Sequence, residues 1–377
     1  MGKARKSKKK KKLGIILIIE VLVLLALVIG YGIWYVNDKL NKIERPDDGI
    51  TEKIDVSDAA TDVMQEEYKT IALFGVDTRD SVDMTKKNAA RSDAIIIACI
   101  NNETKKVKLC SVYRDCFLET ASPDSTTRKV TEAYYYGGPT GAVETLNKNL
   151  DLNITDYVTV DFKALANAID ALGGVTINVK SQEINNLNHN LEEQNEVVSG
   201  MYSEGVWSAG EQVLNGAQAV AYARIRKVGN NDFERTQRQR AVIAAMIAKA
   251  KESDLKTINN VINEVFPQIA TNMTNKQLIS LAADVFDYEL DENTGFPLAH
   301  TTPTLGSKGS VVVPADLLSN VKYLHTFLYP DDEEYTPSSE VQRISAAITN
   351  ETGVYDQFTE DSTTEEPTAT NSTESSN

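Results

Sequence analysis

Five arginines gather in the segment ARIRKVGNNDFERTQRQR, residues 223–240, of a chain whose formal net charge is -15. An arginine stays charged at physiological pH, and its planar guanidinium donates paired hydrogen bonds to carboxylate or phosphate oxygens. The residues from Asp232 onward predict a helix with Asp232 as its N-cap. A helix start adds free N–H groups and partial positive charge, so this segment is typical of a phosphate or diphosphate site.

The predicted helix carries one stripe that changes from polar to apolar along its length, formed by Arg235, Gln239, Val242 and Met246. Arg238 precedes Val242 by four residues, so Arg235 and Arg238 are both predicted on the core-facing side. A solvated charge run would favour the opposite face, and only Arg240 fits that interpretation. We therefore expect Arg235, Arg238 and Gln239 to face a ligand.

Arg224 and Arg226 are two residues apart. They can reach one ligand only if the chain around them is extended or looped, since a helix would point them to different sides. The alternative is that they neutralise the C-terminus of a preceding helix. Nucleic acid is the other polyanion to consider, but an acidic domain with few aromatic residues near its arginines matches it poorly. We predict no nucleic-acid partner.

Three aspartates lie where apolar runs begin or end: Asp77 in GVDTR, Asp93 in RSD and Asp115 in YRD. Arg91 comes just before Asp93, and Arg114 directly precedes Asp115. Strand ends are where α/β sheets present ligands, and two carboxylates with phosphate oxygens and waters suit Mg²⁺. The alternative, which stays open for each motif alone, is that each aspartate pairs with its neighbouring arginine.

The aspartates are brought together by a predicted hairpin. The runs TIALFGVD, DAIIIACI and KVKLCSVYRD read as strands, and NNETK joins the last two. A turn centred near Asn102–Thr104 makes the numbers of paired residues sum to about 207, which lays Asp93 beside Arg114. The same register makes Cys99 and Cys110 diagonal neighbours, a separation that favours buried thiols over a disulfide.

The fold class is predicted as α/β, with a mixed central β-sheet flanked by helices. DYVTVDF reads as a strand, FKALANAIDALGG as a helix and VTINV as the next strand, which is the pattern of a βαβ unit. Residues 181–210 are polar and rich in Asn and Glu, and we expect a surface excursion there. Asn215-Gly216 predicts a helix break or start.

The chain divides into five predicted segments. Residues 1–12 carry a lysine block, residues 13–36 form an apolar run long enough to span a bilayer, and residues 37–65 read as a linker. An extracytoplasmic domain is expected over 66–330, followed by an acidic, Ser/Thr-rich disordered tail at 331–377. This makes a single-pass protein of the cell membrane with a cytoplasmic N-terminus. A cleaved signal peptide is the alternative, but the run is long for one and lacks a small-x-small site.

At this point the motifs identify a resemblance. They follow the order seen in the LytR-CpsA-Psr family over about residues 68–250: GVDTR, RSDAIII, SVYRD, TEAYYYGG, DYVTVDF, DALGGVTINV, NGAQAVAYARIR and DFERTQRQ. The resemblance implies a membrane-anchored enzyme that transfers a glycopolymer, such as wall teichoic acid or capsular polysaccharide, from an undecaprenyl-diphosphate carrier to peptidoglycan. Apolar residues of 162–172 and 241–248 could line a groove for the lipid or belong to ordinary core.

The resemblance also implies roles for single residues. Asp77 and Asp93 match Mg²⁺-binding acids, where Mn²⁺ could replace Mg²⁺, and Asp232 matches an acid that assists proton transfer. Residues that match the diphosphate pocket are Arg91, Arg114, Arg224, Arg226, Arg235 and Gln239, to which the stripe adds Arg238. Asp93, Asp232 and Arg235 are the predicted catalytic residues. Glu234 stands where relatives often have a small residue, and its charge could alter the local loop.

Two other functions remain open from the sequence. The chain could be a non-catalytic extracytoplasmic binder or sensor of lipid phosphates, or a polyprenyl-diphosphate hydrolase that uses water as acceptor. Covalent nucleophile chemistry has no support, because the three histidines lack a Ser or Cys partner pattern and no G-x-S-x-G or H-E-x-x-H motif occurs.

Overall fold

The computed structural model describes residues 35–46, 53–77, 83–121, 124–197, 201–226, 228, 231–284, 286–333 and 335–354. The chain forms two compact units, residues 1–43 and 44–377, and in the first of these residues 35–40 are helical. The predicted basic segment 1–12, the span 13–36 except for its last two residues, and the tail beyond 354 lie outside the described residues. Within the described ranges, no helix combines the length and apolar character that crossing a bilayer requires.

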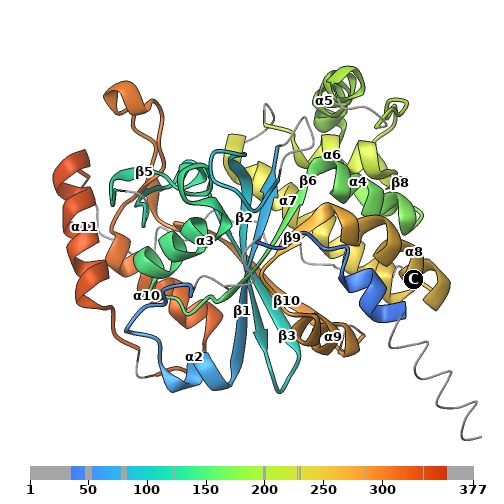
Figure 1. Ribbon diagram of the computed structural model, residues 1–377. Helices are drawn as coiled ribbons and strands as arrows, with labels where there is room; N and C mark the ends of the chain where they lie inside the picture. Colours follow the sequence, from blue (N-terminus) through green and yellow to red (C-terminus); the bar gives the residue numbers. More distant parts are fainter. Residues whose placement is uncertain are drawn as a thin grey trace, which may run out of the picture. The chain divides into compact units, whose positions relative to one another are not determined.

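A six-stranded mixed sheet forms the centre of the second unit, in the order β10-β3-β2-β1-β6-β9 (Figure 1). Its strands are β1 Tyr68–Val76, β2 Ser92–Asn101, β3 Lys106–Val112, β6 Asp156–Asp161, β9 Ile269–Thr271 and β10 Glu289–Phe296. The pairs β1–β2, β2–β3 and β6–β9 are antiparallel, whereas β1–β6 and β10–β3 are parallel. The prediction of an α/β fold with a mixed central sheet is confirmed.

The β2–β3 hairpin has the register that the sequence predicts. Ile97 pairs with Cys110 and Ile96 with Ser111, so the numbers of paired residues sum to 207. Asp93 consequently lies beside Arg114, whose Nη1 is 2.7 Å from the Asp93 carboxylate. The cysteines are free and buried, and burial raises the pKa of Cys110 to about 12. They are therefore uncharged parts of the core, as expected.

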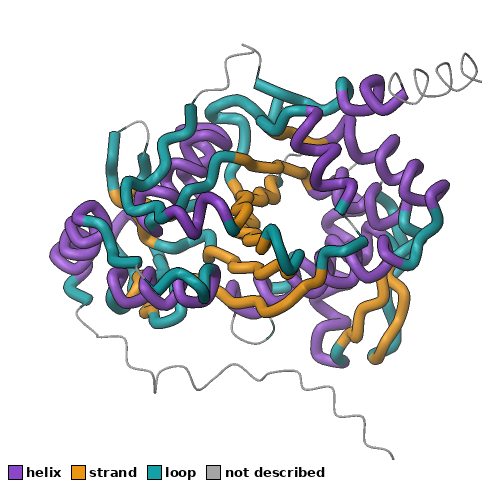
Figure 2. The backbone as a smooth tube through the Cα atoms, turned by 90° about the horizontal axis from the view of Figure 1, so that it is seen from below, coloured by secondary structure: helices purple, strands orange, loops and turns teal. Residues whose placement is uncertain are grey.

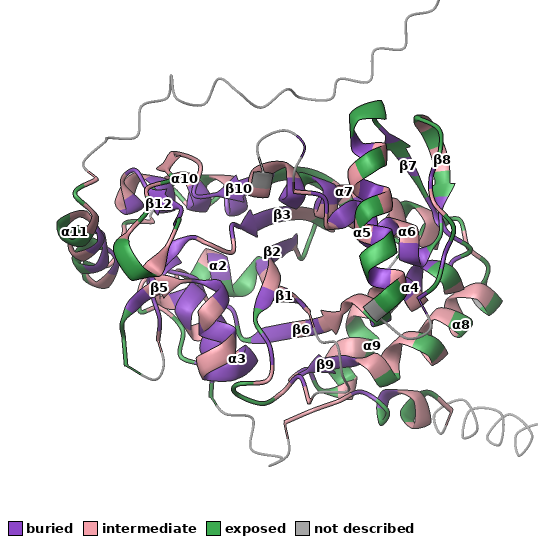
Figure 3. Ribbon diagram, turned by 90° about the horizontal axis from the view of Figure 1, so that it is seen from above, coloured by how far each residue is buried: buried purple, intermediate pink, exposed green. Residues whose placement is uncertain are grey.

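Helices cover both faces of the sheet, because side chains alternate between the faces along each strand. Phe74 and Ile97 belong to a core with Tyr134 and Leu146 of α3, Thr131–Leu150. The opposite face packs on α7, Asn231–Lys251, where Ile243 contacts the cluster formed by Ile96, Ala98 and Leu109. Figure 2 shows the strands enclosed by helices, and Figure 3 shows the buried strands between them. The domain thus has three layers.

The remaining elements extend these layers. The other helices are α2 Asp62–Glu66, α4 Phe162–Ala171, α5 Ile184–Val197, α6 Gly216–Ala223, α8 Leu255–Val265, α9 Asn275–Ala283, α10 Leu317–Leu328 and α11 Ser339–Thr352. Single turns of 3-10 helix lie at Ser181–Glu183, Phe266–Gln268 and Gly306–Lys308. Short strands pair as β4 Phe117–Glu119 with β5 Thr127–Lys129, β7 Val175–Val179 with β8 Gly210–Leu214, and β11 His300–Thr301 with β12 Val313–Pro314.

The predicted βαβ unit is wrong in its pairing, although its three elements exist. β6 and α4 form as expected, but β7 pairs antiparallel with β8 in a separate two-stranded sheet. The turn after α4 directs the chain away from the central sheet. Gly174 lies at φ 92° there, and a Cβ at this position would meet Val213 Cγ1 at 2.6 Å. Only glycine allows this approach of β7 to β8.

The predicted surface excursion at 181–210 is also wrong over its first half, which contains α5. The helix buries Leu187 and Leu191 against α6 and β7. Ile184, Leu187 and Leu191 are spaced three and four residues apart, the repeat of an amphipathic helix. Asn and Glu on the remaining positions, which are exposed or partly exposed, concealed this repeat.

Both predicted domain boundaries are too narrow. Before residue 66, Ile54 and Met64 belong to the central core. After residue 330, where a disordered tail was predicted, α11 buries Ile344 and Ile348 against the same core. Ser338 caps α11 by accepting a hydrogen bond from the Val341 N–H. The acidic composition of this segment masks a short amphipathic helix, because carboxylates occupy only its exposed face and flanks.

The C-terminal helices generate a prediction on acid stability. His325 of α10 is buried, its Nε2–H donates to the Leu150 carbonyl, 2.8 Å away, and its ring stacks on Tyr335. Nδ1 is buried and no described residue offers it a hydrogen bond, so a proton there would be unsatisfied. Burial lowers the pKa of His325 to about 4, although the carboxylates of Asp151 and Asp332 oppose the shift.

The unfolded chain should therefore take up a proton below about pH 6.5 that the folded chain refuses until about pH 4. The free energy of unfolding is expected to fall by up to about 3 kcal/mol across that window because of this one group. Urea denaturation of wild type and His325→Gln at neutral and acidic pH measures the difference. A variant with the wild-type acid dependence would contradict the assignment, and the exposed His189→Gln serves as control.

Candidate functional site

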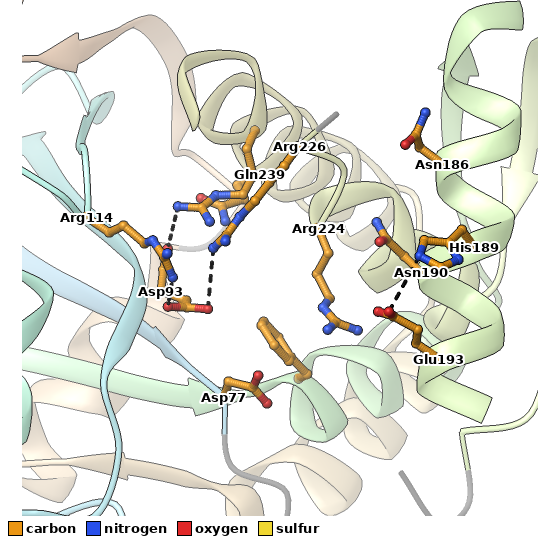
Figure 4. A pocket seen from close by; sticks show the side chains of 12 residues that line it. Asp77, Asp93, Arg114, Asn186, His189, Asn190, Glu193, Arg224, Arg226 and Gln239 are labelled. Atoms are coloured by element: carbon orange, nitrogen blue, oxygen red, sulfur yellow. Dashed lines mark hydrogen bonds and ion pairs between the residues drawn. The ribbon is translucent and has the colours of Figure 1, made fainter. Parts of the chain in front are cut away.

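A cavity of about 270 Å³ opens where the ends of β1 and β2 meet the loop after α6, the start of α7 and one face of α5 (Figure 4). Its described lining contains four arginines, three carboxylates and one aromatic ring: Asp77, Asp93, Arg114, Phe162, Asn186, His189, Asn190, Glu193, Arg224, Arg226, Arg235 and Gln239. Seven of these residues were predicted from the sequence as site residues: Asp77, Asp93, Arg114, Arg224, Arg226, Arg235 and Gln239.

The strand ends supply two carboxylates and one guanidinium. Asp77 directly follows β1, Asp93 is the second residue of β2, and these strands are neighbours in the sheet. Asp93 Oδ1 accepts a hydrogen bond from Arg114 at 2.7 Å, and its Oδ2 lies 3.9 Å from Arg226 Nη2. Burial disfavours the Arg114 cation, but the Asp93 and Asp115 carboxylates outweigh burial and raise its pKa. The sheet thus holds two carboxylates and one guanidinium close together at the ends of its strands.

The loop after α6 supplies Arg224 and Arg226. The helix begins at Asn215, whose side chain accepts from the Gln218 N–H, and it ends at Arg224, so the predicted helix start at Asn215-Gly216 is confirmed. Ile225 is fully buried and anchors the two arginines on either side of it. Both reach the cavity because the chain has left the helix, as the spacing requires. The Arg224 guanidinium lies 5.3 Å from the centroid of the Phe162 ring.

The start of α7 supplies Arg235 and Gln239. Asp232 lies in the first turn of the helix, not at the predicted N-cap, and its Oδ1 contacts Arg235 Nη1 at 3.2 Å and Arg226 Nε at 3.5 Å. Arg235 also donates to the Asp93 main-chain oxygen at 3.4 Å. Burial lowers the pKa of Arg235 to about 10, and the neighbouring arginines add to the shift. Arg235 therefore remains a cation at neutral pH, held in place by Asp232.

Three side chains at this end of α7 have buried polar atoms with which no described residue forms a hydrogen bond: Arg235 Nε, Asp232 Oδ1 and Gln239 Oε1. Arg235 and Gln239 line the cavity, so a bound polar ligand could satisfy their atoms. The cavity is thus prepared for a polar, charged occupant.

The face of α5 that lines the cavity was missed by the sequence analysis. Asn186, His189, Asn190 and Glu193 lie opposite the arginines in Figure 4. Their spacing of three and four residues places them on one face of the helix. Asn190 is oriented by its hydrogen bond to the Ala221 carbonyl, and His189 Nε2 lies 3.5 Å from Glu193. The spacing itself was the available signal, once α5 is recognised as a helix.

A second, apolar cavity of about 270 Å³ adjoins the first. Phe162 and Gln239 line both cavities, so they mark where the polar and apolar cavities meet. Side chains of the sheet, α4, α6 and α7 form its wall, including Leu73, Ile96, Val158, Leu165, Val220, Val242, Ile243 and Met246. Of the segment 241–248, Val242, Ile243, Met246 and Ile247 line the cavity, and of 162–172 only Phe162 and Leu165 do, whereas Ile169 is buried in the core. The stripe on α7 passes from Arg235 in the polar cavity to Met246 in the apolar one.

Three of the ten predicted site residues do not line the cavity. Asp232 contacts two arginines of the lining, Arg226 and Arg235, whereas Arg91 and Arg238 are placed elsewhere. Arg91 is exposed and does not line the cavity; its guanidinium lies 5.5 Å from the centroid of the Tyr135 ring. Arg238 is buried behind the cavity wall, where it pairs with Glu183 at 2.8 Å and Glu234 at 2.7 Å. Glu234, whose extra charge raised a question, is thus the partner of Arg238.

The predicted solvated position of Arg240 is also wrong. Arg240 is 4% exposed, and its Nε donates to Asn293. A stripe on a helix identifies the core-facing side, but it does not separate an arginine that faces a cavity from one that is buried among other polar side chains. Arg240 is buried in this way, with Asn293 of β10 as a partner.

The geometry defines an amphiphile site, with cations and carboxylates at one end and hydrocarbon at the other, on a three-layer α/β domain. The LytR_cpsA_psr family model matches residues 31–293, which is more than half of the chain. The chain belongs to the LytR_cpsA_psr family. α10 and α11 lie beyond the matched residues.

Several curated relatives carry transferase names. The polyisoprenyl-teichoic acid–peptidoglycan teichoic acid transferase TagU of Bacillus licheniformis is 29% identical over 280 residues, which cover 72% of this chain and 80% of TagU. Among solved structures, protein gbs0355 of Streptococcus agalactiae matches with a TM-score of 0.59 and 25% identity, covering 73% of this chain and 92% of that one. Bacillus subtilis TagT shares the fold with a TM-score of 0.52 and 22% identity, covering 80% and 99%.

The position of Arg238 generates a prediction. Replacing Arg238 with Met leaves the carboxylate of Glu183, which is 1% exposed, without a cation in the interior. Breaking a buried ion pair from one side costs about 3–5 kcal/mol, so the free energy of unfolding should fall by that amount. Arg226→Met, which removes a side chain that is 40% exposed, should change it by less than about 1 kcal/mol.

Chemical denaturation of both variants measures the difference. The double variant Arg238→Met with Glu183→Gln should recover part of the loss, because it removes the stranded charge. If Arg238→Met kept wild-type stability and lost only affinity for a diphosphate ligand, Arg238 would be a ligand-binding residue after all.

Proposed function

We propose that this protein transfers a glycopolymer from a polyprenyl-diphosphate carrier to peptidoglycan. One observation carries the proposal: the α7 stripe joins a diphosphate-sized polar cavity to an apolar cavity, with Gln239 lining both. Such a stripe fits a ligand that is a hydrocarbon chain at one end and a phosphorylated sugar at the other. The transferase names of the curated relatives, TagU among them, support the same reaction class.

The transfer is a phosphoryl substitution. A peptidoglycan hydroxyl attacks the phosphorus that carries the sugar, and the bond from that phosphorus to the bridging oxygen breaks. The hydroxyl oxygen becomes linked to the phosphorylated polymer, the hydroxyl proton goes to a base, and the carrier leaves as a polyprenyl monophosphate. Positioning and charge neutralisation dominate the rate of such reactions, and Arg114, Arg224, Arg226 and Arg235 supply both.

Charge favours a divalent cation at the same site. The described lining holds four arginines against three carboxylates, which leaves too little positive charge for a diphosphate. Asp77 and Asp93 offer the oxygen ligands that Mg²⁺ prefers, and Mn²⁺ could replace it. In the described part of the chain no three potential ligands gather into a metal site. Asp77 and Asp93, which both line the cavity, would hold an ion together with substrate phosphate oxygens. When bound, the ion would neutralise charge on the diphosphate.

Asp232 and Asp93 divide the remaining work. Asp232 holds Arg226 and Arg235 through Oδ1, and its carboxylate is the base that we propose to accept the proton of the attacking hydroxyl. Asp93 aligns Arg114 and Arg226 on the two sides of its carboxylate. Arg235 lies between the two acids and would contact the diphosphate directly.

The test combines donor turnover with analysis of the acceptor. Full-length protein is mixed with a polyprenyl-diphosphate oligosaccharide, isolated peptidoglycan and Mg²⁺, and both polyprenyl monophosphate and polymer bound to peptidoglycan are measured. Asp93→Asn should lose roughly a hundredfold or more of turnover and keep donor binding, because it removes charge alignment in the transition state. The exposed Asp287→Asn is the matched control, and chelation of the metal should stop the wild type reversibly.

The alternatives predict different products. A wild type that binds the donor and never releases polyprenyl monophosphate would be a binder or sensor. Release of monophosphate with free polymer and no peptidoglycan adduct would identify a hydrolase. A metal-independent wild type would leave the transfer proposal standing and remove Mg²⁺ from it.

We also propose that residues 13–36 anchor the protein in the cell membrane, with the catalytic domain on the extracytoplasmic side. The lysine-rich start and the apolar run that follows support this orientation. Cell fractionation and protease treatment of intact spheroplasts test it. We expect the protein in the membrane fraction with its domain accessible to protease; a protected domain would contradict the orientation.

A further inference from the structure

Two aromatic side chains stand out from the lobe formed by α5, α6, β7 and β8. Trp207 is 82% exposed and Tyr202 is 79% exposed, although large aromatic side chains are usually buried. Both belong to the segment 201–209, which connects α5 to β8. Each follows a buried residue, since Met201 precedes Tyr202 and Val206 precedes Trp207. The aromatic rings are therefore held out from an anchored backbone.

Side chains of α5 fix this segment. Asn188 donates to the Val206 carbonyl and accepts from the Val206 N–H, each at 2.8 Å. Asn195 makes the same pair of hydrogen bonds with Ser203, at 2.9 and 3.0 Å. An asparagine side chain that hydrogen-bonds both the main-chain N–H and the C=O of one residue replaces the contacts that a neighbouring β-strand would make with that residue. The backbone that carries the rings is thus already ordered before binding. This lowers the loss of conformational entropy on binding, as is typical of a preformed recognition surface.

The same helix connects these rings to the reaction site. The face of α5 with Asn186, His189, Asn190 and Glu193 lines the polar cavity, while Asn188 and Asn195 hold the aromatic segment. Residues 181–223 contain six glutamates and neither lysine nor arginine. This charge repels the anionic surface of a membrane and a polyanionic glycopolymer, but it does not oppose an uncharged polysaccharide.

We propose that Trp207 and Tyr202 bind the acceptor, as a stacking platform for the sugar rings of a neutral glycan strand, the backbone of peptidoglycan. Sugar rings present C–H groups that pack on aromatic faces, and the amides and carboxylates of α5 suit sugar hydroxyls. The platform and the cavity lie on opposite sides of α5, so a glycan strand several sugars long that stacks on the platform extends past the helix to bring a hydroxyl to the cavity. This inference rests on the proposed transfer for the identity of the glycan.

Binding of the acceptor can be measured without any donor. Full-length wild type, Trp207→Ala and Tyr202→Ala are incubated with peptidoglycan sacculi that have been stripped of teichoic acid, and the bound fraction is measured. Loss of one stacking ring should weaken binding by about tenfold. Trp207→Phe should retain most of the affinity. Phe286→Ala removes another exposed aromatic side chain, 52% exposed in the segment between α9 and β10, and should bind as wild type does.

A fluorescence experiment reports on the ring itself. The chain has two tryptophans, Trp34 and Trp207, so a Trp34→Phe background leaves Trp207 as the reporter. Soluble glycan strands of β-1,4-linked N-acetylglucosamine, which carry no charge, should protect Trp207 from acrylamide quenching. Protection by phosphatidylglycerol vesicles and not by glycan strands would overturn the proposal in favour of a membrane contact.

The outcomes separate this inference from the proposed function. If Trp207→Ala binds sacculi like the wild type while donor turnover is normal, the platform is wrong and the transfer stands. If the wild type binds sacculi through Trp207 but never turns over the donor, the platform stands and the transferase assignment fails. With both intact, Trp207→Ala should raise the apparent KM for sacculi about tenfold and leave donor affinity unchanged.

Discussion

An alternation of opposite charges holds the site together. Arg114, Asp93, Arg226, Asp232 and Arg235 follow one another as cation, anion, cation, anion and cation, with contacts of 2.7, 3.9, 3.5 and 3.2 Å. Three guanidiniums this close would repel one another if the two aspartates did not separate them. The carboxylates also orient the guanidinium groups before any ligand binds. Preorganised charge of this kind costs no rearrangement at the moment of reaction.

The rest of the fold keeps that alternation in register. Asp93 and Arg114 come from neighbouring antiparallel strands, Arg226 from a loop pinned by buried Ile225, and Asp232 and Arg235 from one helical turn. A buried second layer lies behind them, in which Arg238 joins Glu183 to Glu234. These ion pairs connect the turn before α5, which contains Glu183, to the start of α7, which contains Glu234 and Arg238. The walls of the cavity are thus coupled through ion pairs that no ligand would touch.

Local patterns were enough to predict the elements that carry the charges. The hairpin register followed from turn position alone, because antiparallel pairing leaves no freedom once the turn is set. The loop at Arg224 followed from spacing, because a helix cannot aim residues two apart at one point. Local sequence patterns failed to predict features that depend on tertiary contacts. The partner of β7, the packing of α11 and the second layer around Arg238 depend on segments far away in the chain, which no local window contains.

Composition misled in the same places. The α5 and α11 segments look like solvated chain because Asn, Glu, Ser and Thr outnumber their few apolar residues. A helix needs only three or four buried positions to dock on a large domain, and both segments have them at the correct spacing. Counting residue types therefore hid one wall of the cavity. The position of apolar residues was more informative than their number.

Gln239 contacts two different environments, since it lines both the charged cavity and the apolar cavity. A substitution at this position is therefore unfavourable on either side. A leucine would pack well in the apolar cavity but would place a methyl group beside the guanidiniums, where it forms no hydrogen bond. A glutamate would neutralise one of the arginines and would place a negative charge next to the apolar cavity. A neutral amide on a two-carbon stem satisfies both neighbours. The identity of one side chain thus records that two unlike environments meet at that point.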